Sequence, residues 1–209
     1  MLTSIPNLLT LSRIIVIPAL CAAFWLPGTW SNWTSLGIFI AAGITDWADG
    51  HMARRYGLHS ELGRFLDPVA DKLLVASAIF MLVAVDRIEG VTVLAALVIL
   101  CREILVAGLR EFLAEVRVKV PVTQLAKWKT AVQMVAIGFL LGGNAAPTWL
   151  PAVLIGEIGL WIAALVTLYT GYDYLRAGLR HMLVHPAEPG PGGGANHPGP
   201  ANRHAATQA

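Results

Sequence analysis

The sequence has little charge and little cysteine for its length. Only 13% of its 209 residues are charged, whereas 56% are hydrophobic, and the mean hydropathy is positive. A soluble domain usually carries about 25% charged residues, so this composition indicates a membrane protein. Cys21 and Cys101 provide neither a disulfide framework nor a metal-type spacing. No soluble face combines basic with aromatic residues, which argues against nucleic-acid binding.

The sequence does contain six apolar stretches, each long enough to cross a bilayer, which takes about 20 helical residues. A spanning segment must satisfy its own backbone hydrogen bonds, so each stretch is predicted to be a helix. We therefore expect an all-α, polytopic membrane protein with six transmembrane helices. The stretches cover residues 8–26, 34–53, 67–85, 91–113, 128–143 and 150–175.

Lysine and arginine are distributed unevenly over the connections between these stretches. They cluster between the second and third stretches, between the fourth and fifth, and after the sixth. The opposite connections 27–33 and 142–149 have no basic residue, and 86–90 has only Arg87. Because cytoplasmic connections are enriched in basic residues, both termini are predicted to be cytoplasmic. We expect a multi-pass protein of the cell (inner or plasma) membrane.

The composition changes near residue 186 to proline, glycine, alanine, asparagine and histidine. Such a segment cannot bury enough apolar surface to offset the entropy of the chain. Residues 1–185 are therefore predicted to form one membrane-embedded domain, and residues 186–209 a disordered cytoplasmic tail.

Aspartates are concentrated where a bilayer tolerates few charges. Asp46 and Asp49 lie near the end of the second stretch, and Asp67 and Asp71 at the start of the third. Residues three or four apart share a face of a helix, so each pair should present two carboxylates together. Four carboxylates at adjacent helix ends would repel one another without a cation between them. Hard oxygen ligands favour Mg²⁺ or Mn²⁺, which also bind phosphate oxygens.

Small and basic residues accompany the first aspartate pair. Gly50 and Ala53 leave room for a flat group beside the helix, and Arg54 offers donors to a diphosphate. Structural alternatives exist for each feature: small residues also serve close helix packing, and Arg54 also suits a cytoplasmic anchor. Asp67-Pro68 is likewise typical of a helix N-cap. The combination of four aspartates with an arginine favours the functional interpretation.

These residues form the pattern Asp46-x2-Asp49-Gly50-x2-Ala53-Arg54-x8-Gly63-x3-Asp67-x3-Asp71. The pattern resembles, without gap or substitution, the signature of the CDP-alcohol phosphotransferase family. The resemblance implies an enzyme that cleaves the diphosphate of a CDP-linked substrate, transfers the phosphoryl group to an alcohol and releases CMP. It implies a two-metal centre held by the four aspartates, with Asp71 as the general base. Asp49, Gly50, Ala53 and Arg54 would then bind the CDP-linked lipid.

The remainder of the chain bears on the acceptor alcohol. Residues 5–13, 45–47 and 66–72 resemble bacterial phosphatidylglycerophosphate synthases. The strongest further resemblance lies in Arg102-Glu103-Ile104, Leu109-Arg110-Glu111 and Lys127-Trp128-Lys129-Thr130 with Gln133. Covering residues 5 to about 180, this resemblance implies CDP-diacylglycerol and glycerol 3-phosphate as substrates, within phospholipid biosynthesis. It also implies a homodimer surrounded by membrane lipids.

Glycerol 3-phosphate is a dianion, so its site requires concentrated positive charge near the metal ions. The candidates for binding its phosphate are Arg102, Arg110, Lys127 and Lys129. Lys127 and Lys129 also lie where cytoplasmic anchors belong, and Arg102 with Glu103 is alternatively a mutually neutralising pair. Asn7 is a candidate contact of the diphosphate or, equally, a helix cap.

Other functions are compatible with parts of this pattern. A phosphatidylinositol phosphate synthase would carry out the same reaction with a different alcohol. A divalent-cation transporter would place acidic residues on several helices near the membrane midplane, whereas these carboxylates gather at one end of two helices. A purely structural scaffold would leave the charges within the membrane unexplained.

Overall fold

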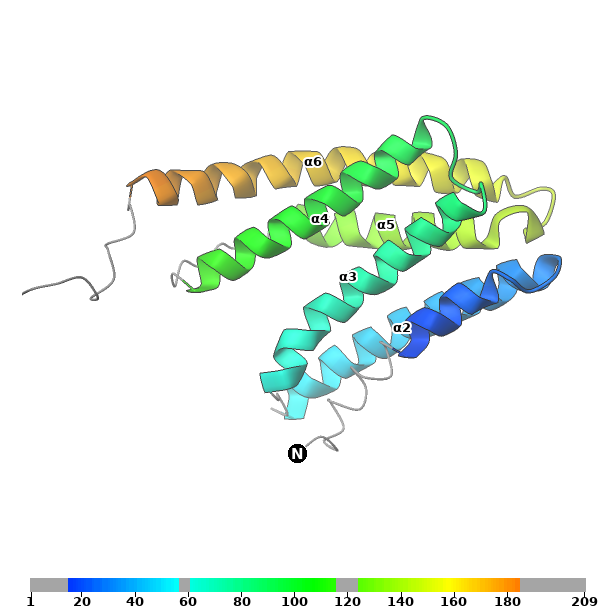
Figure 1. The fold of residues 1–209 in the computed structure, drawn as a ribbon, viewed down its shortest axis with the longest axis horizontal. Coiled ribbons are helices and arrows are strands. Elements are labelled where there is room, and N and C mark those ends of the chain that lie inside the picture. Colours follow the sequence, from blue (N-terminus) through cyan, green and yellow to red (C-terminus); the bar gives the residue numbers. More distant parts are fainter. Residues whose placement is uncertain (1–14, 57–60, 116–123, 185–209) are drawn as a thin grey trace, which may run out of the picture.

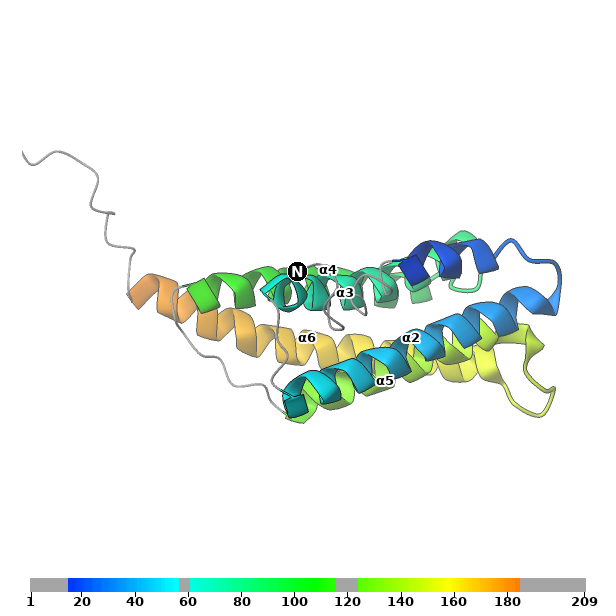
Figure 2. The ribbon, with the colours of Figure 1, turned by 90° about the horizontal axis from the view of Figure 1, so that it is seen from below.

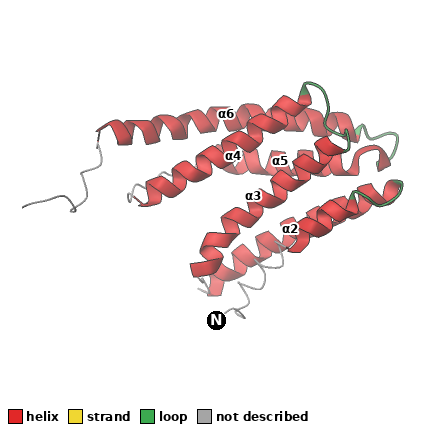
Figure 3. Ribbon diagram, viewed as in Figure 1, coloured by secondary structure: helices red, strands yellow, loops and turns green. Residues whose placement is uncertain are grey.

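A computed structural model describes residues 15–56, 61–115 and 124–184 of the chain. Within these ranges the protein consists of helices and connecting turns, and no strand occurs (Figure 3). The predicted all-α class is therefore confirmed for this part of the chain. Asn7 and the predicted tail at residues 186–209 lie outside the described residues.

Five long helices follow a first helical segment at residues 15–23. They are α2 (Thr29–Tyr56), α3 (Glu61–Ala84), α4 (Thr92–Glu115), α5 (Gln124–Gly142) and α6 (Ala152–Val184), with the 3-10 turn η1 (Gly143–Ala145) after α5. Each coincides with a predicted apolar stretch, and most continue beyond it into polar sequence. Because α3 begins at Glu61, Pro68 lies inside the helix and the interpretation of Asp67 as its N-cap is wrong.

Helices that follow one another in the sequence run in opposite directions. Figures 1 and 2 show the turns before α2, between α3 and α4, and between α5 and α6 at one end of the bundle. The C-terminal ends of α2, α4 and α6 lie at the other end, with the starts of α3 and α5. The signature therefore lies at the end opposite the three described turns.

Helix α6 is the packing centre of one side of the bundle, since α5 and α4 both pack extensively on it. Small residues permit the close approach of α5. A Cβ atom added to Gly156 would lie 2.6 Å from Cγ of Leu140, and one added to Gly159 would lie 2.9 Å from Cβ of Ala136. Close contact through small residues is typical of helix pairs in membranes.

Two of the described helices are long and apolar enough to cross a membrane, namely Thr92–Ala114 within α4 and Ala152–Arg176 within α6. Both expose large apolar side chains, including Ile104 on α4 (70% exposed) and Leu165 on α6 (62% exposed). Exposed apolar surface of this kind is typical of contact with lipid or with another protein. The helices are consistent with a membrane protein, and the number of six spans stays a prediction.

Arg87 connects the turns at the end of the bundle opposite the signature. Its Nη1 donates to the carbonyl of Leu141 at 2.9 Å, and its Nη2 donates to Oδ1 of Asn32 at 3.1 Å and Oγ of Ser31 at 3.3 Å. The guanidinium also lies 5.4 Å from the centre of the Phe24 ring. Burial lowers the pKa of Arg87 from its ordinary value. One side chain thus links the turn between α3 and α4 to the start of α2 and the end of α5.

Candidate active site

The signature is divided between two helices, as the sequence predicts. Asp46 to Arg54 lie in the C-terminal part of α2, and Asp67 and Asp71 in the N-terminal half of α3. Both segments are at the same end of the bundle (Figures 1 and 2). The side chains of Asp46 and Asp71 are half-buried. Those of the other signature residues lie outside the described part: Asp49, Gly50, Ala53, Arg54, Gly63 and Asp67.

The donor chemistry of the signature fits a divalent cation, since carboxylate oxygens are the ligands that Mg²⁺ and Mn²⁺ prefer. Helical backbone through both segments keeps the three-residue and four-residue spacings of the aspartates on shared faces. Among the described side chains there is no group of three or more potential metal ligands. The described set includes Asp46 and Asp71 alone of the four aspartates, so the two-metal centre stays a prediction.

A small cavity of about 60 Å³ lies beside Asp71, where α3, α4 and α5 meet. Its polar lining residues are Asp71, Lys72, Glu103, Lys129, Thr130 and Gln133, and Met134 contributes to its apolar wall. The structure therefore brings the predicted base together with one of the predicted phosphate-binding lysines. These two residues are far apart in the sequence and come from different helices.

Glu103 lies between two cations at this cavity. Nζ of Lys129 and Nη1 of Arg102 both donate to Oε1 of Glu103, the latter at 3.4 Å. The side chains of Arg102 and Lys129 are 11% and 5% exposed, and that of Glu103 is 21% exposed. The three groups carry one net positive charge in a mostly buried setting, which favours an anionic ligand.

Arg102 also joins α4 to α6. Its Nε donates to the carbonyl of Thr167 at 3.1 Å, and its Nη2 donates to Oγ1 of Thr170 at 2.8 Å. Gly171 accommodates this side chain, because a Cβ atom there would lie 3.1 Å from Cγ of Arg102. Of the described phosphate-binding candidates, Arg102 therefore makes the most contacts that hold the fold together.

The other basic candidates occupy different environments. Arg110 is exposed on α4, and its guanidinium lies 5.9 Å from the centre of the ring of Tyr174, a buried residue of α6. A cation–π contact of this kind orients the guanidinium at modest energy. Lys127 lies at the start of α5, and its side chain is outside the described part.

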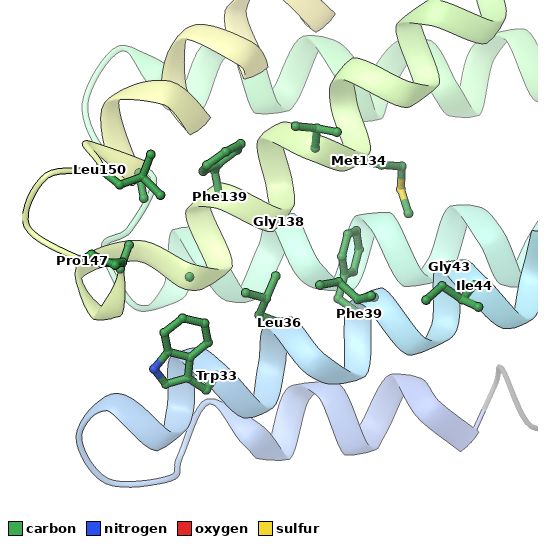
Figure 4. A pocket seen from close by; sticks show the side chains of 15 residues that line it. Trp33, Leu36, Phe39, Gly43, Ile44, Met134, Gly138, Phe139, Pro147 and Leu150 are labelled. Atoms are coloured by element: carbon green, nitrogen blue, oxygen red, sulfur yellow. The ribbon is translucent and has the colours of Figure 1, made fainter.

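An apolar groove of about 810 Å³ lies between α2, α5 and the segment that follows η1 (Figure 4). Trp33, Leu36, Phe39 and Ile44 of α2 face Met134, Gly138 and Phe139 of α5, with Pro147 and Leu150 at one end. Every residue that lines the groove is apolar or glycine. Gly50 follows Gly43 by seven residues, nearly two helical turns, so the signature continues on the groove-lining face of α2.

Met134 contributes to the walls of both spaces, the apolar groove and the cavity that contains Asp71. A Cβ atom added to Gly43 would lie 3.6 Å from Cε of Met134, so the two helices are in contact at this point. A long apolar space and a small polar space therefore meet at one side chain.

Comparison with known proteins identifies the group to which this arrangement belongs. The family described as CDP-alcohol phosphatidyltransferase matches residues 3–169. The chain belongs to the CDP-alcohol phosphatidyltransferase family. This membership confirms the resemblance drawn from the signature and the prediction of an enzyme, a transferase of phospholipid biosynthesis. CDP-alcohol phosphatidyltransferases generally depend on divalent metal ions, which agrees with the donor chemistry of the four aspartates.

Similar individual members of the CDP-alcohol phosphatidyltransferase family come from several bacteria. The CDP-diacylglycerol–glycerol-3-phosphate 3-phosphatidyltransferase of Rickettsia felis is 44% identical over 174 residues, which are 83% of this chain and 94% of that protein. The proteins of the same name from Escherichia coli K12 and Shigella flexneri serotype 5b are each 41% identical over 185 residues, 86% of this chain and 97% of theirs.

Gln133 and Met134 line the cavity and have no role in the sequence-based predictions. Gln133 follows Lys129 by four residues and so shares its face of α5, a spacing that was a usable signal. Met134 has no comparable signal, because an apolar residue in an apolar helix is expected at any position. Only the packing of α2 against α5 distinguishes it.

Proposed function

We propose that the protein transfers the phosphatidyl group from CDP-diacylglycerol to sn-glycerol 3-phosphate, giving phosphatidylglycerophosphate and CMP. The observation that carries the proposal is the junction at Met134, where an apolar groove meets the polar cavity of Asp71. The reaction requires such a junction, because one substrate has two long apolar chains and the other is a small dianion. The similar proteins of Rickettsia felis and Escherichia coli are named for this reaction.

In the proposed arrangement six helices cross the membrane, and the signature and both termini face the cytoplasm. The positions of lysine and arginine support this orientation, because they gather in the connections at the signature end. The alternating direction of the helices supports it as well, since the C-terminal ends of α2, α4 and α6 all lie at the same end of the bundle (Figure 1). The proposed unit is a homodimer, as the family resemblance implies.

The four signature aspartates would hold two Mg²⁺ or Mn²⁺ ions, which when bound neutralise the diphosphate and the leaving oxygen. The side chains of this protein act around them. Gly50 and Ala53 leave space for the cytidine, Arg54 donates to the diphosphate, and Asn7 approaches the same group. Asp71 accepts the proton of the primary hydroxyl of glycerol 3-phosphate. That oxygen bonds to the phosphorus that carries diacylglycerol, the bond from this phosphorus to CMP breaks, and CMP leaves with the electron pair.

Positive charge at the cavity would bind the phosphate of the acceptor. A lysine ammonium has three donors, so its pairing with Glu103 leaves Lys129 the capacity to bind a phosphate oxygen as well. Arg110 and Lys127 would add charge from α4 and α5, whereas Arg102 contributes mainly by holding Glu103 and α6 in place.

The test is CMP release by the purified protein with CDP-diacylglycerol and Mg²⁺ or Mn²⁺. We expect release with glycerol 3-phosphate and none with inositol 1-phosphate. Asp71→Asn should abolish release while CDP-diacylglycerol still binds, because an amide cannot accept the proton. Asp86→Asn is the matched control: Asp86 is exposed in the turn between α3 and α4 with φ of 55°, a conformation that asparagine also adopts.

Three results would contradict the proposal. Release with inositol 1-phosphate alone would identify a different acceptor. Normal turnover of Asp71→Asn would remove Asp71 from the role of base. Cation flux into liposomes, without CMP release from any alcohol, would favour the transporter.

A further inference from the structure

One buried polar atom at the cavity beside Asp71 has no partner among the described residues. Gln133 is 3% exposed, and its Oε1 makes no hydrogen bond within the described part of the protein. Most buried polar atoms are hydrogen-bonded, because an unsatisfied one has lost water without replacement. If the side-chain amide is turned by 180°, its nitrogen takes the position of Oε1 and presents a donor instead of an acceptor. A hydroxyl group can hydrogen-bond to either atom, because it both donates and accepts.

The cavity has the size and polarity for part of a small alcohol. Its volume is about 60 Å³, whereas one water molecule requires roughly 10–15 Å³, so it has room for a short hydroxyl-bearing segment. Asp71 lines one part of it, and Lys129 and Gln133 line another from one face of α5. A molecule with a reacting hydroxyl, a second hydroxyl and a phosphate would match these groups.

We infer that Gln133 binds the secondary hydroxyl of the acceptor and thereby selects polyol phosphates over phosphates with a single hydroxyl. The inference rests on the proposed function and adds a specificity-determining residue to it. The two hydroxyls of glycerol 3-phosphate are on adjacent carbons, so a cavity that holds the primary one at Asp71 also receives its neighbour. Lys129, one helical turn before Gln133, would lie toward the phosphate.

A site built to hydrogen-bond a hydroxyl discriminates against an analogue without it, because the buried polar group is then left unsatisfied. Loss of one such hydrogen bond corresponds to about 10-fold to 100-fold in rate. The same Gln133 as a purely structural residue, satisfied by a buried water molecule, would affect both substrates equally. The ratio of the two rates therefore separates these roles.

The experiment compares glycerol 3-phosphate with 3-hydroxypropyl phosphate, which lacks the secondary hydroxyl, by CMP release with CDP-diacylglycerol and Mg²⁺. We expect the unmodified protein to prefer glycerol 3-phosphate by about 10-fold or more in kcat/KM. In Gln133→Leu, and in the unbranched variant Gln133→Met, this preference should fall to about 3-fold or less. The kcat/KM for glycerol 3-phosphate should decrease, and the kcat/KM for 3-hydroxypropyl phosphate should not change. Asn144→Leu removes an exposed amide at the opposite end of the bundle and should leave the ratio unchanged.

Two results would overturn the inference and leave the proposed function standing. One is a preference below about 3-fold in the unmodified protein, which needs no variant to interpret. The other is an equal decrease of kcat/KM for both substrates in the Gln133 variants, which is the result expected if Gln133 is a purely structural residue. Absence of CMP release with glycerol 3-phosphate in the unmodified protein would instead contradict the proposed function itself.

Discussion

Loss of the carboxylate of Glu103 should destabilise the protein more than loss of the ammonium of Lys129. Glu103 attracts two cations, Arg102 and Lys129, which repel each other across it. The variant Glu103→Gln removes both attractions and keeps the repulsion. The variant Lys129→Met removes one attraction and the repulsion together. The two substitutions are therefore unequal, although each removes one charge.

The geometry gives the size of the difference. At the Arg102–Glu103 separation of 3.4 Å and an effective dielectric constant of about 20, one attraction is about 5 kcal/mol. Both cations donate to the same oxygen, so their repulsion acts over less than about twice that distance and is at least about 2.5 kcal/mol. Before desolvation, Glu103→Gln thus loses about 10 kcal/mol and Lys129→Met at most about 2.5 kcal/mol. Relief of desolvation offsets much of both, which leaves about 3–5 kcal/mol for the former and about 0–2 kcal/mol for the latter.

Unfolding of the purified protein in detergent, followed by the fluorescence of its seven tryptophans, measures these free energies. Adding Lys129→Met to Glu103→Gln should restore stability, because it removes one of the two cations left facing each other. Glu89→Gln, an exposed residue in the turn before α4, is the control and should change stability by less than about 0.5 kcal/mol. Equal effects of the two single variants, or no recovery in the double variant, would refute this reasoning.

Two further predictions concern the packing of the bundle. Gly156→Ala should lower the free energy of unfolding by about 1–3 kcal/mol, because the added Cβ would overlap Leu140. Gly37 has open space around it, so Gly37→Ala should be neutral or stabilising in the same unfolding measurement. Arg87→Leu should lower the free energy of unfolding by about 2–3 kcal/mol, because three hydrogen bonds are lost. The loss should be the same from pH 5 to pH 9, because an arginine stays protonated over that range even with its lowered pKa. Thermal unfolding at several pH values checks this, and a loss that varies with pH would contradict it.

The positions of the helices could be predicted from the sequence because a bilayer constrains them strongly. Every apolar stretch within the described residues became part of a helix, since no other structure satisfies the backbone in lipid. The start of α3 was less predictable. Its first six residues, 61–66, mix charged with apolar residues and start the helix before the predicted apolar stretch, which places Pro68 in its interior. Hydropathy gives the apolar length of a helix and not its extension into more polar sequence.

The candidate site was predictable in its chemistry and less so in its pairings. Asp46 and Asp71 were found because charge is costly in an apolar helix and their spacing is regular. The contact of Lys129 with Glu103 depends on how α4 and α5 are both placed by their packing on α6, and residue spacing along a single helix does not give that placement. The junction at Met134 depends likewise on the approach of α2 to α5. Contacts between helices therefore account for most of what the sequence left open.

The contact of Arg102 with Thr167 has a consequence for the synthesis of the protein. The two residues are 65 positions apart, so α4 leaves the ribosome well before its partner carbonyl exists. At about 5–20 residues per second, the delay is roughly 3–13 seconds. During that interval the neighbouring Glu103 is the partner already present on the nascent chain. If α4 inserts as a membrane span, the carboxylate beside the guanidinium lowers the cost of insertion, and the arrival of α6 then adds the hydrogen bonds to Thr167 and Thr170.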